Sequence, residues 1–269
     1  MSMNPTNIEW CTISWNPFTG CCHPFNKVWK NNAGVENPLI RTCEYCYAVQ
    51  VAENKRGTPA FPKGFEPTFH ANRLEEPIRF KKPAIIFADS MSDAFGDWWK
   101  ECEIWEFLEH LWQAKHHKFV VLTKNPERML RELTNHYEGE TDIFQHVYFG
   151  TSVTGADDGT TFLQEASRIC ALGEVSDMGF KTVISFEPLL GDPKPLNDGT
   201  SGITWADWII IGGQTGPVKV PSTYWVYQII KASEGIPRFV KDNAAYDGSG
   251  QYKQFPEDLR PIAEAWGKA

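Results

Sequence analysis

Short apolar segments alternate with longer amphipathic segments from residue 83 onward. The apolar segments are rich in β-branched and aromatic side chains, which is typical of strands that are buried on both faces of a parallel sheet. Together with a first strand near the N-terminus, they predict the strands Thr12–Trp15, Ala84–Ala88, Phe119–Thr123, Val147–Ser152, Thr182–Phe186, Trp208–Gly212 and Pro237–Lys241.

Most of the segments between these strands have apolar residues spaced three or four apart, which predicts helices. An open doubly wound sheet normally has five or six strands, whereas a barrel accommodates about seven strand–helix units. We therefore expect an α/β fold, a complete or partial (β/α) TIM-like barrel with about six to seven parallel strands. The predicted helices are one from near Cys46 to before Gly57, then Trp99–Ala114, a helix opening at Asn125-Pro126-Glu127, Thr161–Leu172 and Tyr224–Ser233.

The chain is expected to form a single domain over residues 1–269, in three parts. Residues 1–82 are irregular and carry most of the cysteines, and their turn residues predict an exposed loop over Asn31–Pro38. Residues 83–241 hold the βα units, and residues 242–269 form a C-terminal tail.

Charge and hydropathy narrow the class of protein. Lys and Arg number 26 against 34 Asp and Glu, so the net charge of −8 argues against broad attraction to nucleic acid or to an anionic membrane. A run of about 18 apolar residues, which a membrane span needs, is absent from the sequence. The N-terminus lacks the pattern of a secretory signal, so we expect a cytoplasmic protein without a membrane partner.

The cysteines cluster near the N-terminus, and a reducing compartment makes disulfides an unlikely use for them. Cys43 and Cys46 form a C-x2-C pair, whose thiolates bind the same metal or cluster. The third ligand is Cys21 or Cys22, and the spacing does not decide between them. Three thiolates on a [4Fe–4S] cluster leave one iron open, whereas structural zinc needs a fourth ligand. Cys11, Cys22 or His23 would supply that fourth ligand, so iron–sulfur and zinc stay equal alternatives at this point.

Polar or glycine-containing residues follow five of the predicted strands. Barrel active sites form at the C-terminal ends of the strands, so these residues are expected to converge on one mouth. Besides a cluster site, these strand ends allow a second interpretation, in which the protein is a hydrolase that uses the acids Asp89, Asp93 and Glu187 and the cysteines are structural. The five strand ends are Asp89-Ser90, Thr123-Lys124, Thr151-Ser152, Glu187-Pro188 and Gly212-Gly213-Gln214.

From about residue 7 to residue 241 the chain resembles a phage-associated family with a three-cysteine motif, labelled as a domain of unknown function and distantly related to radical S-adenosylmethionine (radical SAM) enzymes. Three departures stand out: a long insertion between Cys21 and Cys43, Gln214 in place of the usual Glu, and an unusual end after Lys241. The resemblance is carried by Ile8-Glu9-Trp10, Trp15-Asn16-Pro17, Thr19-Gly20-Cys21, Cys43-Glu44-Tyr45-Cys46-Tyr47-Ala48, Ser90-Met91-Ser92-Asp93, Leu122-Thr123-Lys124, Gly150-Thr151-Ser152-Val153, Glu187-Pro188-Leu189-Leu190-Gly191 and Asp207-Trp208-Ile209-Ile210-Ile211-Gly212-Gly213.

The resemblance implies a barrel of the radical SAM type and a set of site residues. Cys21, Cys43 and Cys46 would hold a [4Fe–4S] cluster, whose open iron binds the amino and carboxylate groups of SAM. Reductive cleavage of SAM would give a 5′-deoxyadenosyl radical that abstracts hydrogen from the substrate. The implied SAM-binding residues are Tyr45 at the adenine and Ser90, Ser92 and Asp93 at the amino group. Ser152 and Glu187 would contact the ribose or the methionine. Gly212 and Gly213 would lie beneath the adenine, and Gln214 next to them is included in the same site.

The substrate and the partners stay open at this stage. A nucleobase, a nucleic acid or a peptide would each suit the family, and Lys124, Arg128 and Lys241 would suit an anionic substrate. The resemblance also implies an electron donor such as flavodoxin or ferredoxin, and a separately encoded partner protein. The alternative from a different class is a binding module without catalysis, stabilised by zinc or by a cluster.

Overall fold

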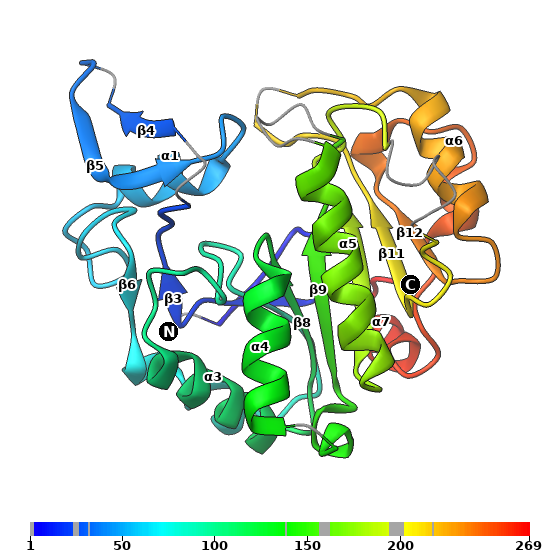
Figure 1. The fold of residues 1–269 in the computed structure, drawn as a ribbon, viewed down its shortest axis with the longest axis horizontal. Coiled ribbons are helices and arrows are strands. Elements are labelled where there is room, and N and C mark those ends of the chain that lie inside the picture. The colour runs from blue at the N-terminus through cyan, green and yellow to red at the C-terminus, as the bar shows by residue number, and fades with distance from the viewer. Residues whose placement is uncertain are drawn as a thin grey trace.

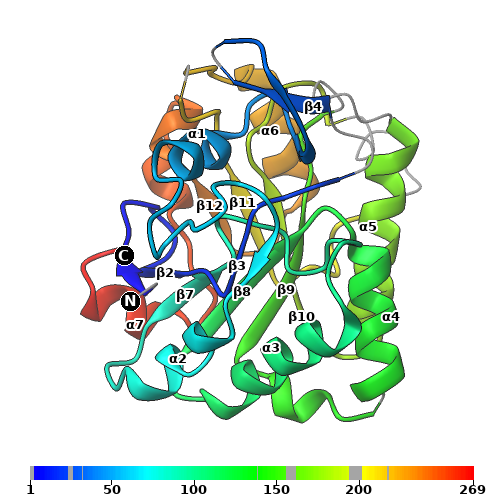
Figure 2. The same cartoon turned by 90° about the vertical axis from the view of Figure 1, so that its left-hand side faces the viewer.

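An eight-stranded sheet, curled into an open half-barrel, forms the centre of the computed structural model (Figures 1 and 2). The structure describes residues 3–23, 27–31, 33–137, 139–155, 162–193, 202–216 and 218–269. Seven strands run parallel, and β1 pairs antiparallel with β2 at one edge. In sheet order the strands are β1 (Asn4–Pro5), β2 (Ile13–Trp15), β7 (Ile85–Ala88), β8 (Lys118–Thr123), β9 (Val147–Ser152), β10 (Lys181–Phe186), β11 (Trp208–Ile211) and β12 (Arg238–Val240).

This sheet confirms the expected mixed α/β fold and, of the two barrel forms, the partial one. Alternate residues of each strand belong to two different apolar clusters, as the period of two in a strand requires. Ile86 and Ala88 pack in the larger cluster with the helices, whereas Ile85 packs in the smaller one on the other face. Both faces are therefore buried, which explains why the strands are continuous apolar runs in the sequence.

The helices follow the strands as the apolar spacing predicts. Figure 1 shows α4 and α5 side by side on one face of the sheet, and α3 contacts α4 through Trp105 and Glu132. Of the predicted helix over residues 161–172, Thr161 lies outside the described residues, and the described helix continues to Asp177. The helices are α1 (Tyr47–Asn54), α2 (Glu76–Arg79), α3 (Glu101–Gln113), α4 (Pro126–Tyr137), α5 (Phe162–Asp177), α6 (Thr223–Ala232) and α7 (Arg260–Ala265), with short 3-10 turns at Ala71–Arg73, Thr141–Phe144, Asp242–Ala244 and Ser249–Tyr252.

The C-terminal segment packs against the inner face of the half-barrel. Phe255, Leu259 and Ala263 are buried there beside Trp208. Asp258 accepts hydrogen bonds from Lys118 and Lys181, the first residues of β8 and β10, and from the Tyr148 hydroxyl of β9, at 2.6, 2.7 and 2.6 Å. The segment therefore covers the N-terminal ends of the strands, and the C-terminal ends remain open for a site.

The insertion between the cysteines contains a β-hairpin. Its strands β4 (Lys27–Lys30) and β5 (Glu36–Thr42) pair antiparallel. The predicted loop over residues 31–38 is therefore wrong for residues 36–38, which begin β5, and Asn32 lies outside the described residues. The hairpin forms because its backbone groups pair with each other, and Ile40 anchors it in a small apolar cluster with α1. A second small sheet joins β3 (Phe18–Thr19) to β6 (Thr68–Phe69).

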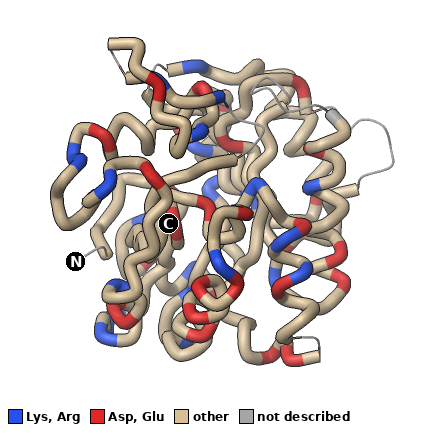
Figure 3. Tube along the Cα trace, turned by 60° about the vertical axis from the view of Figure 1, so that its left-hand side comes forward, with Lys and Arg blue, Asp and Glu red and all other residues tan. Residues whose placement is uncertain are grey.

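Acidic and basic residues are interspersed along the same helices (Figure 3). This distribution agrees with the absence of a strongly basic composition in the sequence. Among the described residues, a helix with the length and apolar character needed to cross a membrane is not found.

Candidate functional site

A cavity of about 1070 Å³ lies at the C-terminal ends of the parallel strands. It brings together residues that are up to about two hundred positions apart in the sequence. Gly212 is buried and, unlike the other predicted site residues, does not line this cavity. The predicted residues that line it are Cys21, Cys43, Tyr45, Cys46, Ser90, Ser92, Asp93, Ser152, Glu187, Gly213 and Gln214.

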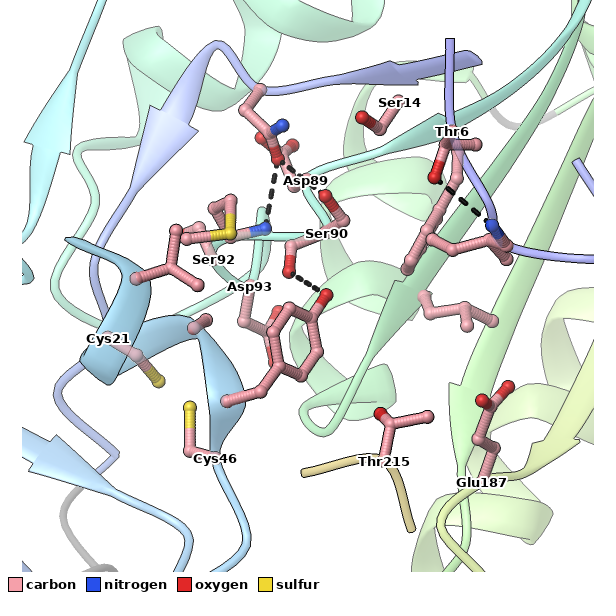
Figure 4. Close-up of a pocket in the computed structure, with 18 of the residues that line it drawn as sticks. Thr6, Ser14, Cys21, Cys46, Asp89, Ser90, Ser92, Asp93, Glu187 and Thr215 are labelled. Carbon is pink, nitrogen blue, oxygen red and sulfur yellow. Dashed lines mark hydrogen bonds between the residues drawn. The ribbon is translucent and has the colours of Figure 1, made fainter. Parts of the chain in front are cut away.

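Two separate loops present the three cysteines. Cys21 follows β3 and the sharply turned Gly20, whose φ of +87° lies in the left-handed region. Cys43 and Cys46 form one turn directly before α1, closed by a 3.0 Å hydrogen bond from the Cys46 backbone N–H to the Cys43 carbonyl. Figure 4 shows the sulfur atoms of Cys21 and Cys46 facing one another.

The other cysteines of the N-terminal region lie outside the cavity lining. Cys22 forms a β-bridge with Arg41 of β5. Cys11 is fully buried in the apolar cluster on the inner face of the sheet. The geometry thus groups Cys21, rather than Cys22, with the C-x2-C pair.

The three sulfurs are spaced more widely than the ligands of a single tetrahedral ion. Among the described residues, the cysteines do not form a group whose ligand atoms all lie within 4.8 Å, so at least one pair of sulfurs is farther apart. Tetrahedral zinc, with Zn–S bonds of about 2.3 Å, would hold its sulfurs about 3.8 Å apart. A [4Fe–4S] cluster binds each thiolate through a different iron and therefore needs wider spacing.

Burial makes these thiols hard to ionise in the absence of a cation. It raises the pKa of Cys21 well above its usual range, and the charges of Asp93 and Cys43 add to the effect. Burial likewise raises the pKa of Cys46 to about 11. A bound iron cluster would supply the positive charge that holds the sulfurs as thiolates. The donor set therefore fits the cluster that the sequence implies.

The segment after β7 holds the loop that carries Cys21. The Gly20 N–H donates to the Met91 carbonyl at 3.0 Å, and the Ser92 hydroxyl donates to the Gly20 carbonyl at 2.7 Å. The Ser90 hydroxyl donates to the Asn16 side-chain oxygen at 3.1 Å. Of the two serines predicted at the amino group of SAM, Ser92 thus already positions the loop of the first cysteine, and Ser90 holds Asn16.

Asp93 is a buried carboxylate whose oxygens are both used. Its Oδ2 contacts His23 Nε2 at 3.0 Å and accepts from the Lys124 backbone N–H at 2.8 Å. Its Oδ1 accepts from the Thr123 hydroxyl at 2.6 Å and from the Phe95 backbone N–H at 3.0 Å. Burial alone would raise the pKa of Asp93, but the hydrogen bonds from His23, Thr123 and Lys124 lower it overall. Asp93 is therefore occupied in holding loops together, which disfavours a role as a hydrolytic base.

Glu187 forms an ion pair with Lys241 at the cavity wall, and Trp10 Nε1 lies 3.4 Å from its other oxygen. Gly212 makes room for this pair, since a Cβ there would lie 2.9 Å from Cδ of Lys241. A Cβ on Gly213 would lie 2.5 Å from the Asn243 carbonyl. The close approach expected for adenine at these glycines is therefore taken by the chain's own residues after β12.

Of the remaining predicted residues, Lys124, Ser152 and Gln214 line the same cavity. The Lys124 ammonium lies 5.4 Å from the centre of the Tyr45 ring. Ser152 ends β9, and Gln214 forms a β-bridge with Lys219. Arg128 does not serve an anionic substrate: it is buried and donates to the carbonyls of Gly96 and Trp99 and to Glu132.

Tyr47 and Asn16 are among the cavity residues to which sequence reasoning assigned no role in the site. The Tyr47 hydroxyl donates to the Ser90 carbonyl at 3.0 Å, which Figure 4 draws as a dashed line. Asn16 accepts from both the Ser90 hydroxyl and the Met91 backbone N–H. Tyr47 directly follows Cys46, and this position beside a predicted ligand is the feature of the sequence that could have indicated its role. For Asn16 the contacts are long-range, and the sequence carries no comparable signal.

The sequence matches, over residues 5–254, a family model described as "Protein of unknown function (DUF5131)", and the chain belongs to that family. Among the curated proteins, a match to this chain was not found.

Two solved structures have a similar fold. One is a cysteine-to-alanine mutant of spore photoproduct lyase with dinucleoside spore photoproduct, at a TM-score of 0.50 and 10% identity over 87% of this chain and 64% of that chain. The other is a cysteine-to-serine mutant of the same enzyme, at a TM-score of 0.50 and 11% identity over 87% and 65%. The chain thus spans less than two thirds of the length of these proteins. Spore photoproduct lyase is a radical SAM enzyme, and the likeness is one of fold.

Proposed function

We propose that this protein is a radical SAM enzyme in which Cys21, Cys43 and Cys46 hold a [4Fe–4S] cluster and the adjoining cavity binds SAM and a substrate. The observation that carries this function is that the three thiols, from two separate loops, open onto one cavity at the C-terminal ends of a parallel half-barrel. The similarity in fold to a radical SAM enzyme supports the same function.

Cys21, Cys43 and Cys46 would hold the cluster, which would supply one electron for the reductive cleavage of SAM to methionine and a hydrogen-abstracting 5′-deoxyadenosyl radical. The chain's own residues hold the reactants together and exclude water, because water and solvent-borne species would quench the radical. Tyr45, between the two cysteines of the C-x2-C pair, offers an aromatic surface at this place. Ser152 and Glu187 offer polar groups at the opposite strands.

The cavity volume also supports a second ligand beside SAM. Pockets for one drug-sized molecule measure about 300–1,000 Å³, and this cavity, at about 1070 Å³, lies slightly above that range. A substrate held in the same cavity would lie within reach of the radical. We further propose a small redox protein such as flavodoxin or ferredoxin as the source of the electron.

The function is tested on protein purified under anaerobic conditions and reconstituted with iron and sulfide. We expect a brown protein with about four irons per chain and broad visible absorbance. Adding dithionite and SAM is expected to release 5′-deoxyadenosine and methionine in equal amounts. The products are measured by liquid chromatography and mass spectrometry.

Single serine variants of Cys21, Cys43 and Cys46 should lose both the colour and the 5′-deoxyadenosine. Cys22→Ser is the matched control, because Cys22 is adjacent in sequence but lies outside the cavity lining, and it should keep both. A colourless protein with one tightly bound zinc would instead support the binding module. Full iron loading without any cleavage of SAM would contradict the proposed reaction.

A further inference from the structure

The cavity has a second end, away from the cysteines, beside the edge of the sheet at β1 and β2. Figure 4 shows Thr6, Ser14 and Asp89 gathered on one side of the cavity, and Cys21 and Cys46 on the other. Register places these groups together, because Asn4 of β1 pairs with Ser14 of β2, and Ser14 pairs with Phe87 of β7. Most side chains at this end are neutral hydrogen-bonding groups: Asn4, Thr6, Ser14, Asn16 and Asn72.

The charged groups at this end are Arg73, Glu76 and Asp89, and Asp89 is in an unusual state. It lines the cavity directly after β7, is only 2% exposed and has a φ of +61°, in the left-handed region that side chains rarely adopt. Its Oδ1 accepts from the Phe18 backbone N–H at 3.0 Å. Its Oδ2 is buried and has no hydrogen-bond partner within the part of the chain that the structure describes. Burial raises the pKa of Asp89 well above its usual range, and the neighbouring charge of Asp93 adds to this effect.

The nearby cation is Arg73, and it does not neutralise Asp89 by a direct contact. Arg73 donates instead to the backbone carbonyls of Asn16, Pro59 and Ala60, at 2.9, 3.3 and 2.8 Å. Since its guanidinium is used in this way, it is also a poor receptor for a phosphate group. An isolated buried carboxylate is costly, so the group is held better as a neutral carboxylic acid with one O–H donor.

An aromatic surface lies next to this carboxyl. Phe87 of β7 lies two residues before Asp89, and both residues line the cavity. The ring centre of Phe87 lies 4.8 Å from that of Trp10, which also lines the cavity. A flat ring that packs against Phe87 would present its edge to Asp89 and Ser14.

We propose that this end of the cavity binds an uncharged planar ring with adjacent N–H and C=O groups, such as the lactam edge of a nucleobase, and that Asp89 recognises that edge. The neutral carboxyl donates from Oδ2 to the ring carbonyl and accepts the ring N–H on the second lone pair of Oδ1. This subsite would hold the substrate of the radical SAM function proposed above, on which the substrate role rests. A ligand that lacks the N–H would be rejected, because the buried acceptor Oδ1 of Asp89 would then be left without that hydrogen bond.

The test is calorimetric titration of the reconstituted full-length chain, without reductant, using uridine and N3-methyluridine. The two ligands share the ring and the sugar, but methylation removes the N–H of the lactam edge. We expect N3-methyluridine to bind at least about tenfold more weakly than uridine. Uridine affinity should be unchanged by saturating SAM.

Variants of Asp89 assign the recognition to one side chain. Asp89→Gly fits the left-handed backbone and removes the carboxyl, so uridine should bind about 10- to 100-fold more weakly and the preference over N3-methyluridine should vanish. Asp89→Asn keeps one donor and one acceptor and should stay within about threefold of the parent affinity. Ser14→Ala, which leaves the Phe18 contact intact, should weaken uridine binding several-fold; the exposed Asp97→Asn should not.

Several results would overturn this assignment. They are equal binding of the two nucleosides, competition between uridine and SAM, or Asp89-dependent binding of the peptide analogue N-acetylglycine N-methylamide in place of uridine. The Cys21→Ser chain separates the two proposals, because it should fail to cleave SAM and still bind uridine. A parent chain that binds uridine through Asp89 but never cleaves SAM would keep the subsite and refute the radical function.

Discussion

His23 and Asp93 join the two sides of the cysteine site: Nε2 of His23 lies 3.0 Å from Oδ2 of Asp93. His23 stands two residues after Cys21, and Asp93 stands at the end of the segment that follows β7. Asp93 also accepts from Thr123 and from the Lys124 N–H at the end of β8. One carboxylate thus connects the first cysteine loop to two neighbouring strands of the sheet.

Asp93→Asn should loosen this connection. The amide has one acceptor oxygen in place of two and lacks the charge, so we expect the free energy of unfolding to fall by about 2–3 kcal/mol. Iron retained after reconstitution should fall as well, because the Cys21 loop loses its anchor. Urea denaturation and iron content per chain measure the two effects.

The control for this variant is Asp97→Asn. Asp97 lies four residues away, is exposed and accepts one hydrogen bond from Asn125 at 2.9 Å. Its loss should cost about 0.5 kcal/mol or less. Equal effects of the two substitutions on iron retention would show that Asp93 does not position the cysteine loop.

Gly20→Ala should prevent Cys21 from reaching the cavity. A Cβ at this position would lie 2.4 Å from the Phe65 carbonyl oxygen, and the φ of +87° disfavours any side chain. Because the obstacle is backbone, we expect a loss of about 3 kcal/mol or more in the free energy of unfolding. Thermal unfolding and visible absorbance after reconstitution check this outcome.

Gly57→Ala is the matched substitution for Gly20→Ala. Gly57 has a similar φ of +84°, but a Cβ there would meet nothing within 4 Å. It should cost only the conformational strain, about 1–2 kcal/mol, and leave iron binding intact. A Gly20→Ala chain that unfolds no more readily than Gly57→Ala would contradict the close contact at Gly20.

Asp258→Asn should change how stability depends on pH. Burial alone would raise the pKa of Asp258, but hydrogen bonds from Lys118, Lys181 and Tyr148 lower it to about 2. Since the pKa is lower in the folded state than the ordinary value of about 3.9, the carboxylate stabilises the fold above that value. This stabilisation is lost as the pH falls from about 5 to about 2.

At pH 7 the Asp258→Asn chain should be less stable by about 1–2 kcal/mol, a figure that allows for water around this partly exposed carboxyl. Urea denaturation from pH 7 down to pH 3 should show the difference from the parent chain shrinking. Glu257→Gln, at an exposed neighbouring position, should stay within about 0.5 kcal/mol of the parent throughout. A difference independent of pH would assign the effect to packing instead of charge.

The strands show how well the local sequence pattern predicts the positions of secondary-structure elements. The predicted strand over residues 147–152 coincides with β9, and the other predicted parallel strands fall within one or two residues of the observed ones. Burial on both faces leaves a continuous apolar run, which is visible without knowledge of the neighbours. The hairpin at β4 and β5 was missed in part because an exposed pair of strands is held by its own backbone contacts, and turn residues dominate its composition.

The C-terminal segment shows the opposite case. Its turns and a helix of only six residues give little periodic signal. Its position depends on Asp258 meeting two lysines and a tyrosine from three different strands. The burial of the C-terminal segment is created by contacts between distant parts of the chain, so the sequence pattern does not reveal it.

The sequence by itself determined the parallel α/β architecture and the C-x2-C pair at Cys43 and Cys46, because both depend on residues that are near one another in the chain. Only the tertiary structure decided that Cys21, and not Cys22, lines the cavity with them. That choice depends on the turn at Gly20 and on its hydrogen bonds to Met91 and Ser92, more than seventy residues away. Spacing alone does not encode the direction of a thiol, since the direction follows from the backbone that packs around it.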